Sequence, residues 1–289
     1  MMAYSIIAAV LYIILAPFIG GLLAGIDRKI TARMQGRIGP SVLQPFYDVS
    51  KLLNKNVFKI NDIQYVFAIC FLVFIIITGA LFFAGCDLLL VFFMLTTAAM
   101  FLVIEASATN TPFAVMGSQR ELAQMLSYEP MVLLTAVGFY MATGSFSVSD
   151  IIAAETPAIA YLPGVFVGFV YILSIKFRKS PFDISTSHHA HQELVKGVTT
   201  ELSGRMFAVV EISHWYENVF LIGIIGLFVV FKAWWSVLVA IAVIAAAYFI
   251  EILIDNTSAR VKWGLMFRLT WILTVIFGVI NIFVLYLLK

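Results

Sequence analysis

The feature that most constrains this chain is a series of apolar runs long enough to cross a lipid bilayer. A transmembrane helix needs about 20 mostly apolar residues, and eight segments reach or approach that length. They are Tyr4–Ile26, Gln64–Phe83, Leu88–Ile104, Leu122–Met141, Tyr161–Phe177, Met206–Phe231, Ala233–Ile254 and Trp263–Leu288. We therefore predict an all-α polytopic membrane protein with eight transmembrane helices, in which residues 1–289 form a single integral membrane domain.

The composition supports lipid as the main solvent of the chain. Hydrophobic residues make up 62% of the sequence and charged residues only 12%, which is about half the charged share of an ordinary soluble domain. A soluble fold of this size could not cover so much apolar surface. The 18 Lys and Arg residues nearly balance the 16 Asp and Glu residues, so the sequence also excludes nucleic-acid binding through bulk charge.

The basic residues between the spans predict the orientation. All but two of the 18 basic residues lie on the side that holds the segments after spans one, three, five and seven, and only Lys232 and Lys289 lie on the other side. Basic residues are retained on the cytoplasmic side of membrane proteins. We therefore expect both termini to face outward, with long cytoplasmic loops after helices 1, 3 and 5.

Several acidic residues lie inside the predicted spans. A charged side chain in the bilayer costs a few kcal/mol, so it is expected to have a function. Glu105 ends span three, and Glu129 lies in span four before Pro130, which tends to kink a helix. We predict that both glutamates belong to a proton path in the inner half of the membrane. The alternative for Glu129 is a carboxylate satisfied by Tyr128 or Arg120.

Span six carries Glu211, His214 and Glu217 at a spacing of three residues. This spacing places them on one helix face. A carboxylate–imidazole–carboxylate run suits proton relay, because histidine titrates near neutral pH. The alternatives are a structural polar stripe that packs against another helix, or a helix end at which Glu211 reaches the headgroups.

Metal binding is not predicted for this chain. Cys70 and Cys86 would lie about 24 Å apart along a helix, and two separate thiols hold neither an iron–sulfur cluster nor a structural zinc. His188 and His191 could share a helix face, but no set of ligands completes a site. We expect these histidines to act as cytoplasmic-side proton donors or as contacts to a partner, and any redox metal to lie in another polypeptide.

Ordered motifs cover the chain from end to end. They are Asp27-Arg28-Lys29, Gln35-Gly36-Arg37, Asp48-x-x-Lys51, the run from Arg120 to Glu129, Ser180-Pro181-Phe182-Asp183, Glu193-Leu194-Val195 and Glu201-Leu202-Ser203-Gly204. Together with the eight spans, they resemble the NADH dehydrogenase subunit 1 family of respiratory complex I and its membrane-bound hydrogenase relatives.

The resemblance implies a role beneath a peripheral redox arm. It implies partner subunits that carry iron–sulfur clusters and catalysis, including nickel–iron, together with small and antiporter-like membrane subunits. The residues expected to couple redox chemistry to ion movement are Glu129, Asp183, Glu193 and Glu201. The residues expected to dock the arm are Asp27, Arg28, Lys29, Arg37, Asp48, Lys51, His188 and His191.

The stretch Ala190-His191-Gln192-Glu193 is similar to energy-converting nickel–iron hydrogenases and sulfane-sulfur reductase complexes. We therefore favour a subunit of an ion-pumping, hydrogenase-type complex in the cell membrane, with a sulfane-sulfur reductase second and a quinone-reducing complex third. A different class is a stand-alone secondary transporter. Such transporters often have two related halves with broken helices, and the sequence contains no such repeat.

Overall fold

The computed structural model describes residues 2–57, 61–187 and 194–288. The described residues form α-helices with short 3₁₀ and π segments and contain no strand. The helices are α1 (Met2–Met34), α2 (Gln44–Leu53), α3 (Asp62–Phe83), α4 (Leu88–Ser107), α5 (Pro112–Thr143), α6 (Val148–Ile152), η1 (Ala158–Ala160), α7 (Pro163–Lys176), η2 (Gly197–Thr199), α8 (Gly204–Val229), α9 (Ser236–Thr257), α10 (Trp263–Leu273), η3 (Thr274–Val279) and α11 (Ile280–Leu288).

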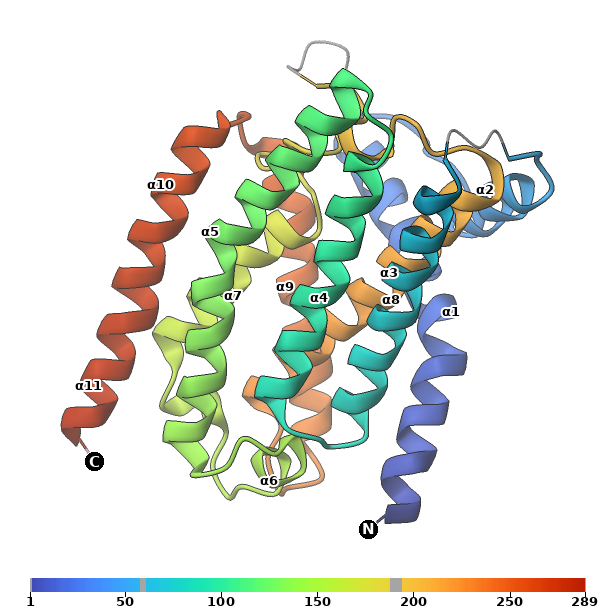
Figure 1. The fold of residues 1–289 in the computed structure, drawn as a ribbon. Coiled ribbons are helices and arrows are strands. Elements are labelled where there is room, and N and C mark those ends of the chain that lie inside the picture. Colours follow the sequence, from blue (N-terminus) through green and yellow to red (C-terminus); the bar gives the residue numbers. More distant parts are fainter. Residues whose placement is uncertain (1, 58–60, 188–193, 289) are drawn as a thin grey trace.

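The long helices run alongside one another in a single bundle (Figure 1). Both chain termini lie at one end of the bundle, together with α6. The opposite end, called the α2 end below, carries α2 and the first residues of α3, α5 and α8. Within the described part of the chain, seven helices are long and apolar enough to cross a membrane, and α7 is a shorter apolar helix. The all-α prediction is confirmed.

Local sequence explains where several helices begin and end. The side chain of Asn61 accepts a hydrogen bond from the Ile63 amide at the start of α3, and Asp87 caps α4 by accepting from Leu89 and Leu90. These caps satisfy amides that have no partner within the helix. Helix α5 ends at Gly144, which has the left-handed φ of 83° that glycine accommodates without a Cβ clash.

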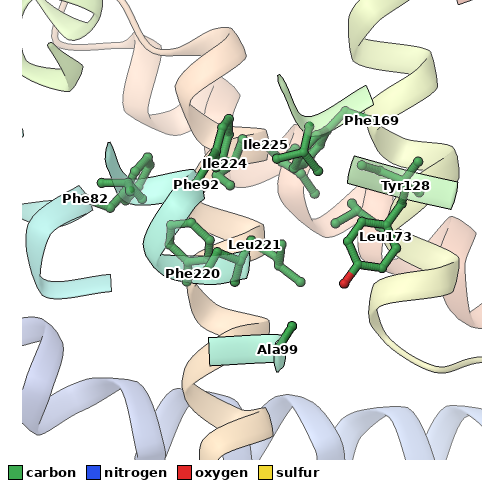
Figure 2. Packing of buried hydrophobic residues seen from close by; sticks show 14 of the residues in the cluster. Phe82, Phe92, Ala99, Tyr128, Phe169, Leu173, Phe220, Leu221, Ile224 and Ile225 are labelled. Carbon is green, nitrogen blue, oxygen red and sulfur yellow. The ribbon is translucent and has the colours of Figure 1, made fainter. Parts of the chain in front are cut away.

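The centre of the bundle is filled by aromatic and branched side chains around α8 (Figure 2). Phe220 of α8 meets Phe82 of α3 edge to face, with ring centroids 5.4 Å apart. On the other side of α8, Phe228 contacts Phe139 of α5 at 4.6 Å. Helix α8 is the most extensively buried of the long helices, so the acidic residues in its first half are held between neighbouring helices.

Two helix boundaries differ from the predicted spans. Helix α5 begins at Pro112, ten residues before the predicted start at Leu122, because its first turns carry polar residues that lower hydropathy yet are buried in the bundle. The last span contains a π segment, η3, and is fastened by Asn281, whose side-chain oxygen accepts a 3.1 Å hydrogen bond from the Val165 amide.

Candidate functional site

A non-helical segment brings three basic side chains into the bundle. Helix α7 ends at Lys176, and residues 177–187 continue without regular helix. Lys176 is only 4% exposed, and Arg178 has a left-handed φ of 52°, a conformation that is uncommon outside glycine and concentrates at functional sites. The sequence analysis treated these residues as loop charges. The structure corrects that interpretation, because Lys176, Arg178 and Lys179 each pair with an acid from another segment.

These cations neutralise two acids that come from different spanning helices. Lys176 Nζ lies 3.3 Å from Glu217 Oε1 on α8. Arg178 Nη1 lies 3.3 Å from Glu217 Oε2, and Arg178 Nη2 lies 2.7 Å from Glu121 Oε1 on α5. A buried charge without a partner costs several kcal/mol, so the two cations allow Glu121 and Glu217 to be charged inside the protein. Arg178 therefore links α5 to α8.

His214 joins this cluster as predicted from its spacing. Its Nδ1 lies 3.1 Å from Arg178 Nη1 and 3.4 Å from Glu217 Oε2. Glu211, one turn earlier on α8, is partly buried and lines a cavity of about 180 Å³ together with His214 and Arg178. The structure thus brings Glu211, His214 and Glu217 to one polar region on α8.

Glu129 extends the cluster on the α5 side. It accepts a hydrogen bond from the Thr96 hydroxyl of α4 and lies close enough to Lys176 to act on it electrostatically. Tyr128 does not satisfy Glu129 as one alternative suggested, because the Tyr128 ring packs against Lys176 Nζ at 4.4 Å.

The charges of this cluster do not balance. Its carboxylates are those of Glu121, Glu129 and Glu217, and its permanent cations are Lys176 and Arg178. With neutral His214, the cluster has one more carboxylate than cation. An excess negative charge at this depth is expensive. The cluster is therefore suited to hold one exchangeable proton.

The loop before α8 is attached directly to this cluster. Ser185 donates a hydrogen bond to Glu121 Oε2, and the Val198 amide donates to the Ser185 carbonyl at 3.1 Å. Gly117 of α5 allows this approach, because a Cβ there would lie 2.5 Å from the backbone of Gly197. A charge change at Glu121 would therefore act on the loop through a hydrogen bond.

Other predicted relay residues lie apart from the cluster. Glu105 is fully buried and accepts a 2.7 Å hydrogen bond from Gln64 of α3. Asp183 lies 3.3 Å from Arg260 Nε, in the segment before α10. Glu201 is partly buried in the turn between η2 and α8. Glu193 lies outside the described residues.

The predicted docking residues lie at the α2 end, where many exposed basic side chains gather. The basic face, as we call it, consists of Arg28, Lys29, Arg33, Arg37, Lys51, Lys55, Lys196 and Arg205. Arg28 Nη1 contacts Asp48 Oδ2 at 2.7 Å. Partial burial opposes ionisation of Asp48, but hydrogen bonds from Arg28 and Gln44 outweigh it and hold the pKa of the carboxyl below its ordinary value.

Two further sets of predicted residues differ from this pattern. Asp27 does not face outward with the basic face, because its Oδ2 lies 2.8 Å from the nearly buried Lys179 Nζ. His188 and His191 lie outside the described residues. Among the residues that the structure describes, no group of three or more His, Cys, Asp or Glu side chains is placed to hold a metal ion.

The sequence analysis missed Glu121, Lys176 and Arg178 as members of the site. A signal for Glu121 was present, because Glu121, Gln124 and Tyr128 recur at helical spacing on one face of α5, and all three are buried. The signal for Lys176 was weaker. It was a lysine that directly follows an apolar run and precedes two further basic residues.

The fold and this buried polar site define a polytopic integral membrane protein, and comparisons with known proteins give its family. The profile of the NADH dehydrogenase family matches residues 6–286. The chain belongs to this family, whose members include subunit 1 of NADH dehydrogenase.

Relatives within this family occur in more than one kind of complex. A membrane component of the NADH-quinone oxidoreductase of Geobacter sulfurreducens is 28% identical over 314 residues, covering 96% of this chain and 93% of that protein. Hydrogenase-4 component C of Escherichia coli strain K12 is 26% identical over 296 residues, covering 93% and 91%.

A solved structure has the same fold. A chain in the structure of the membrane-bound sulfane sulfur reductase, an archaeal respiratory membrane complex, superposes with a TM-score of 0.83. The sequences are 24% identical, and the match covers 96% of this chain and 99% of that chain.

Proposed function

We propose that this chain is the membrane-anchor and redox-coupling subunit of an ion-pumping respiratory oxidoreductase of the membrane-bound hydrogenase type, located in the cell membrane. The observation that carries the proposal is the buried cluster around Glu217, which has more carboxylates than cations and lies in the half of the bundle nearest the basic face. A proton site next to a docking surface is what coupling of redox chemistry to ion movement requires.

The proposed topology has eight crossings, with both termini outside and the α2 end in the cytoplasm. Helix α7 is the eighth crossing. Its 14 residues span about 21 Å, less than the roughly 30 Å hydrocarbon core. Residues 177–187 fill the remaining depth as irregular backbone, which membrane proteins tolerate where it is enclosed by protein and lines a polar site. The position of both termini at one end of the bundle agrees with an even number of crossings (Figure 1).

The basic face would receive the peripheral arm. Its exposed arginine and lysine side chains come from the end of α1, from α2 and from the start of α8, so they form a continuous positive surface suited to an acidic partner. In this proposal the arm holds the iron–sulfur clusters and the nickel–iron catalytic subunit. Small membrane subunits and antiporter-like subunits would flank the apolar sides of the bundle.

The proposed proton path runs inward from the cytoplasmic side. The cavity beside Glu211 and His214 admits a proton, His214 contacts Glu217 at 3.4 Å, and Lys176 connects Glu217 to Glu129. Asp183, Glu193 and Glu201 lie in the segments around the loop that leads to Glu121 and would supply protons or transmit its movement. Glu129 has a hydroxyl partner rather than a close cation, so we assign the exchangeable proton to it.

The metal content of the intact complex tests the class of oxidoreductase. Affinity purification of this chain from its native membrane should bring down a multi-subunit complex that contains iron and nickel. Iron without nickel would favour the sulfane-sulfur reductase or the quinone-reducing complex instead. A single purified chain that moves a solute across liposomes without partners would refute the subunit proposal and establish the secondary transporter.

A further inference from the structure

A second polar opening lies at the α2 end, beside α1 and α9. It is a groove of about 540 Å³ between the end of α1, the end of α9 and the segment after α7. Its walls include Asp255 and Asn256 of α9, Thr31 of α1, and Lys179 and Asp183. The path proposed above follows α5, α7 and α8, so the acids that α9 places in and behind this groove have no role in it.

Behind the groove, α9 carries a buried glutamate with little to stabilise its charge. Glu251 is 1% exposed. Its Oε2 accepts a 2.8 Å hydrogen bond from the Ser174 hydroxyl of α7, and its Oε1 has no hydrogen-bond partner among the described residues. Glu217, at a similar degree of burial, has two cations within 3.3 Å. An unpaired carboxyl in such a place is expected to bind a proton rather than remain charged.

The charged groups around Glu251 do not change this conclusion. Lys179 is the cation that acts on it, but Lys179 Nζ is already 2.8 Å from Asp27 Oδ2. Asp255 on the same helix adds a negative charge, and Asp183 acts on Asp255 in the same sense. The acids in this region therefore outnumber the single lysine, which favours a neutral Glu251.

Asp255 connects Glu251 to the groove. The two acids are four residues apart on α9, so they lie on one face about 6 Å apart along the helix axis. Asp255 lines the groove and is oriented by the Ser180 amide, which donates to its Oδ1 at 2.9 Å. A proton from groove water can bind the Asp255 carboxylate and then pass to Glu251, with no other reactant required.

We propose that Glu251 is a second proton-binding site of this protein, loaded from the groove through Asp255 and oriented by Ser174. The site ends on α7 two residues before Lys176, so it approaches the cluster around Glu217 from the side opposite His214. Its part in ion pumping rests on the function proposed above. Proton binding by Glu251 does not, and can be measured without turnover.

Infrared difference spectroscopy of the purified complex tests the assignment. A protonated carboxyl group has a carbonyl band that shifts when H₂O is replaced by D₂O. Glu251→Gln should lose one such band, and Asp255→Asn should keep the band but slow its shift in D₂O. Ser174→Ala should keep the band at a changed frequency, because the hydroxyl no longer donates to the carboxyl. Asp150→Asn, at the terminal end of the bundle, should leave all these bands as in the wild type.

An unchanged spectrum in Glu251→Gln would overturn the assignment. If that variant does not assemble, Ser174→Ala decides the question, and a band of unaltered frequency there would overturn it equally. A wild-type complex that shows the band but does not pump ions would refute the proposed function while leaving the proton site in place.

Discussion

Arg178 donates a 2.7 Å hydrogen bond to Glu121, which lies 57 residues earlier in the chain on a different spanning helix. The same guanidinium reaches Glu217 on α8, so one residue outside the helices joins the acids of two helices. Through Ser185, which also donates to Glu121, the cytoplasmic loop is connected to the buried charges. This connection makes the stability of the cluster and its chemistry inseparable, and the first prediction concerns that stability.

The Lys176–Glu217 pair should show strong coupling in a double-mutant cycle. Both side chains are about 3% exposed. Removing one partner from a buried pair leaves an uncompensated charge and costs about 3–5 kcal/mol. Lys176→Met should therefore lower the free energy of unfolding by about that amount, and Lys176→Met with Glu217→Gln should be less destabilised than the sum of the single variants. Denaturant unfolding of the purified protein measures the coupling. Additive effects would show that the two charges do not interact.

Gly117→Ala should destabilise the protein, although alanine is favoured over glycine by about 1 kcal/mol within a helix. The new Cβ would lie 2.5 Å from the backbone of Gly197 and Val198, so the loop that carries Ser185 must move away from α5. The matched control is Gly264→Ala on α10, where the Cβ meets open space. The control should retain the wild-type thermal midpoint or raise it, while Gly117→Ala lowers it. Equal midpoints would contradict the close approach of the loop.

The Arg28–Asp48 pair should give a small, pH-dependent contribution to stability. The folded-state pKa of Asp48 is below its ordinary value, so the contribution is fully present above the pKa of an unfolded aspartate. It is lost as the pH falls through the folded value. Both side chains are largely solvent-exposed, so screening limits the effect to about 1 kcal/mol or less. Asp48→Asn should remove this acid-dependent part from unfolding curves, and added salt should weaken it in the wild type.

Charge reversal on the basic face should release the peripheral arm. Arg37→Glu or Lys51→Glu places a negative charge on an exposed surface that we propose binds an acidic partner, so co-purification of the arm subunits should fall. Lys232→Glu is the control, because Lys232 follows α8 at the other end of the bundle. An arm that remains bound in the Arg37 and Lys51 variants would argue against this docking surface.

The spans were predictable because apolar runs of membrane length leave few alternatives, and Leu88 and Trp263 begin α4 and the last span as expected. The start of α5 was not, because Glu121 and Gln124 lower the hydropathy of a segment whose polar face is buried in the bundle. The partners of Lys176 and Arg178 were also beyond prediction. They lie 41 and 57 residues away along the chain, and only the packing of α5, α7 and α8 brings them together.

The three-residue spacing on α8 was more informative. It placed Glu211, His214 and Glu217 on one face, and the structure puts all three in the same polar region. The spacing could not reveal that Glu217 is held by two cations. It therefore could not show that Glu129, with only a hydroxyl donor, is the better candidate for the exchangeable proton.

Proton pumping by a complex that contains Glu129→Gln tests the central claim most directly. Glutamine keeps an oxygen that can accept from Thr96, so assembly and electron transfer should persist, while the exchangeable proton of the cluster is lost. We predict that proteoliposomes with this variant transfer electrons but translocate few or no ions per electron, whereas Asp150→Asn pumps as the wild type does. Wild-type pumping by the Glu129→Gln complex would contradict the account.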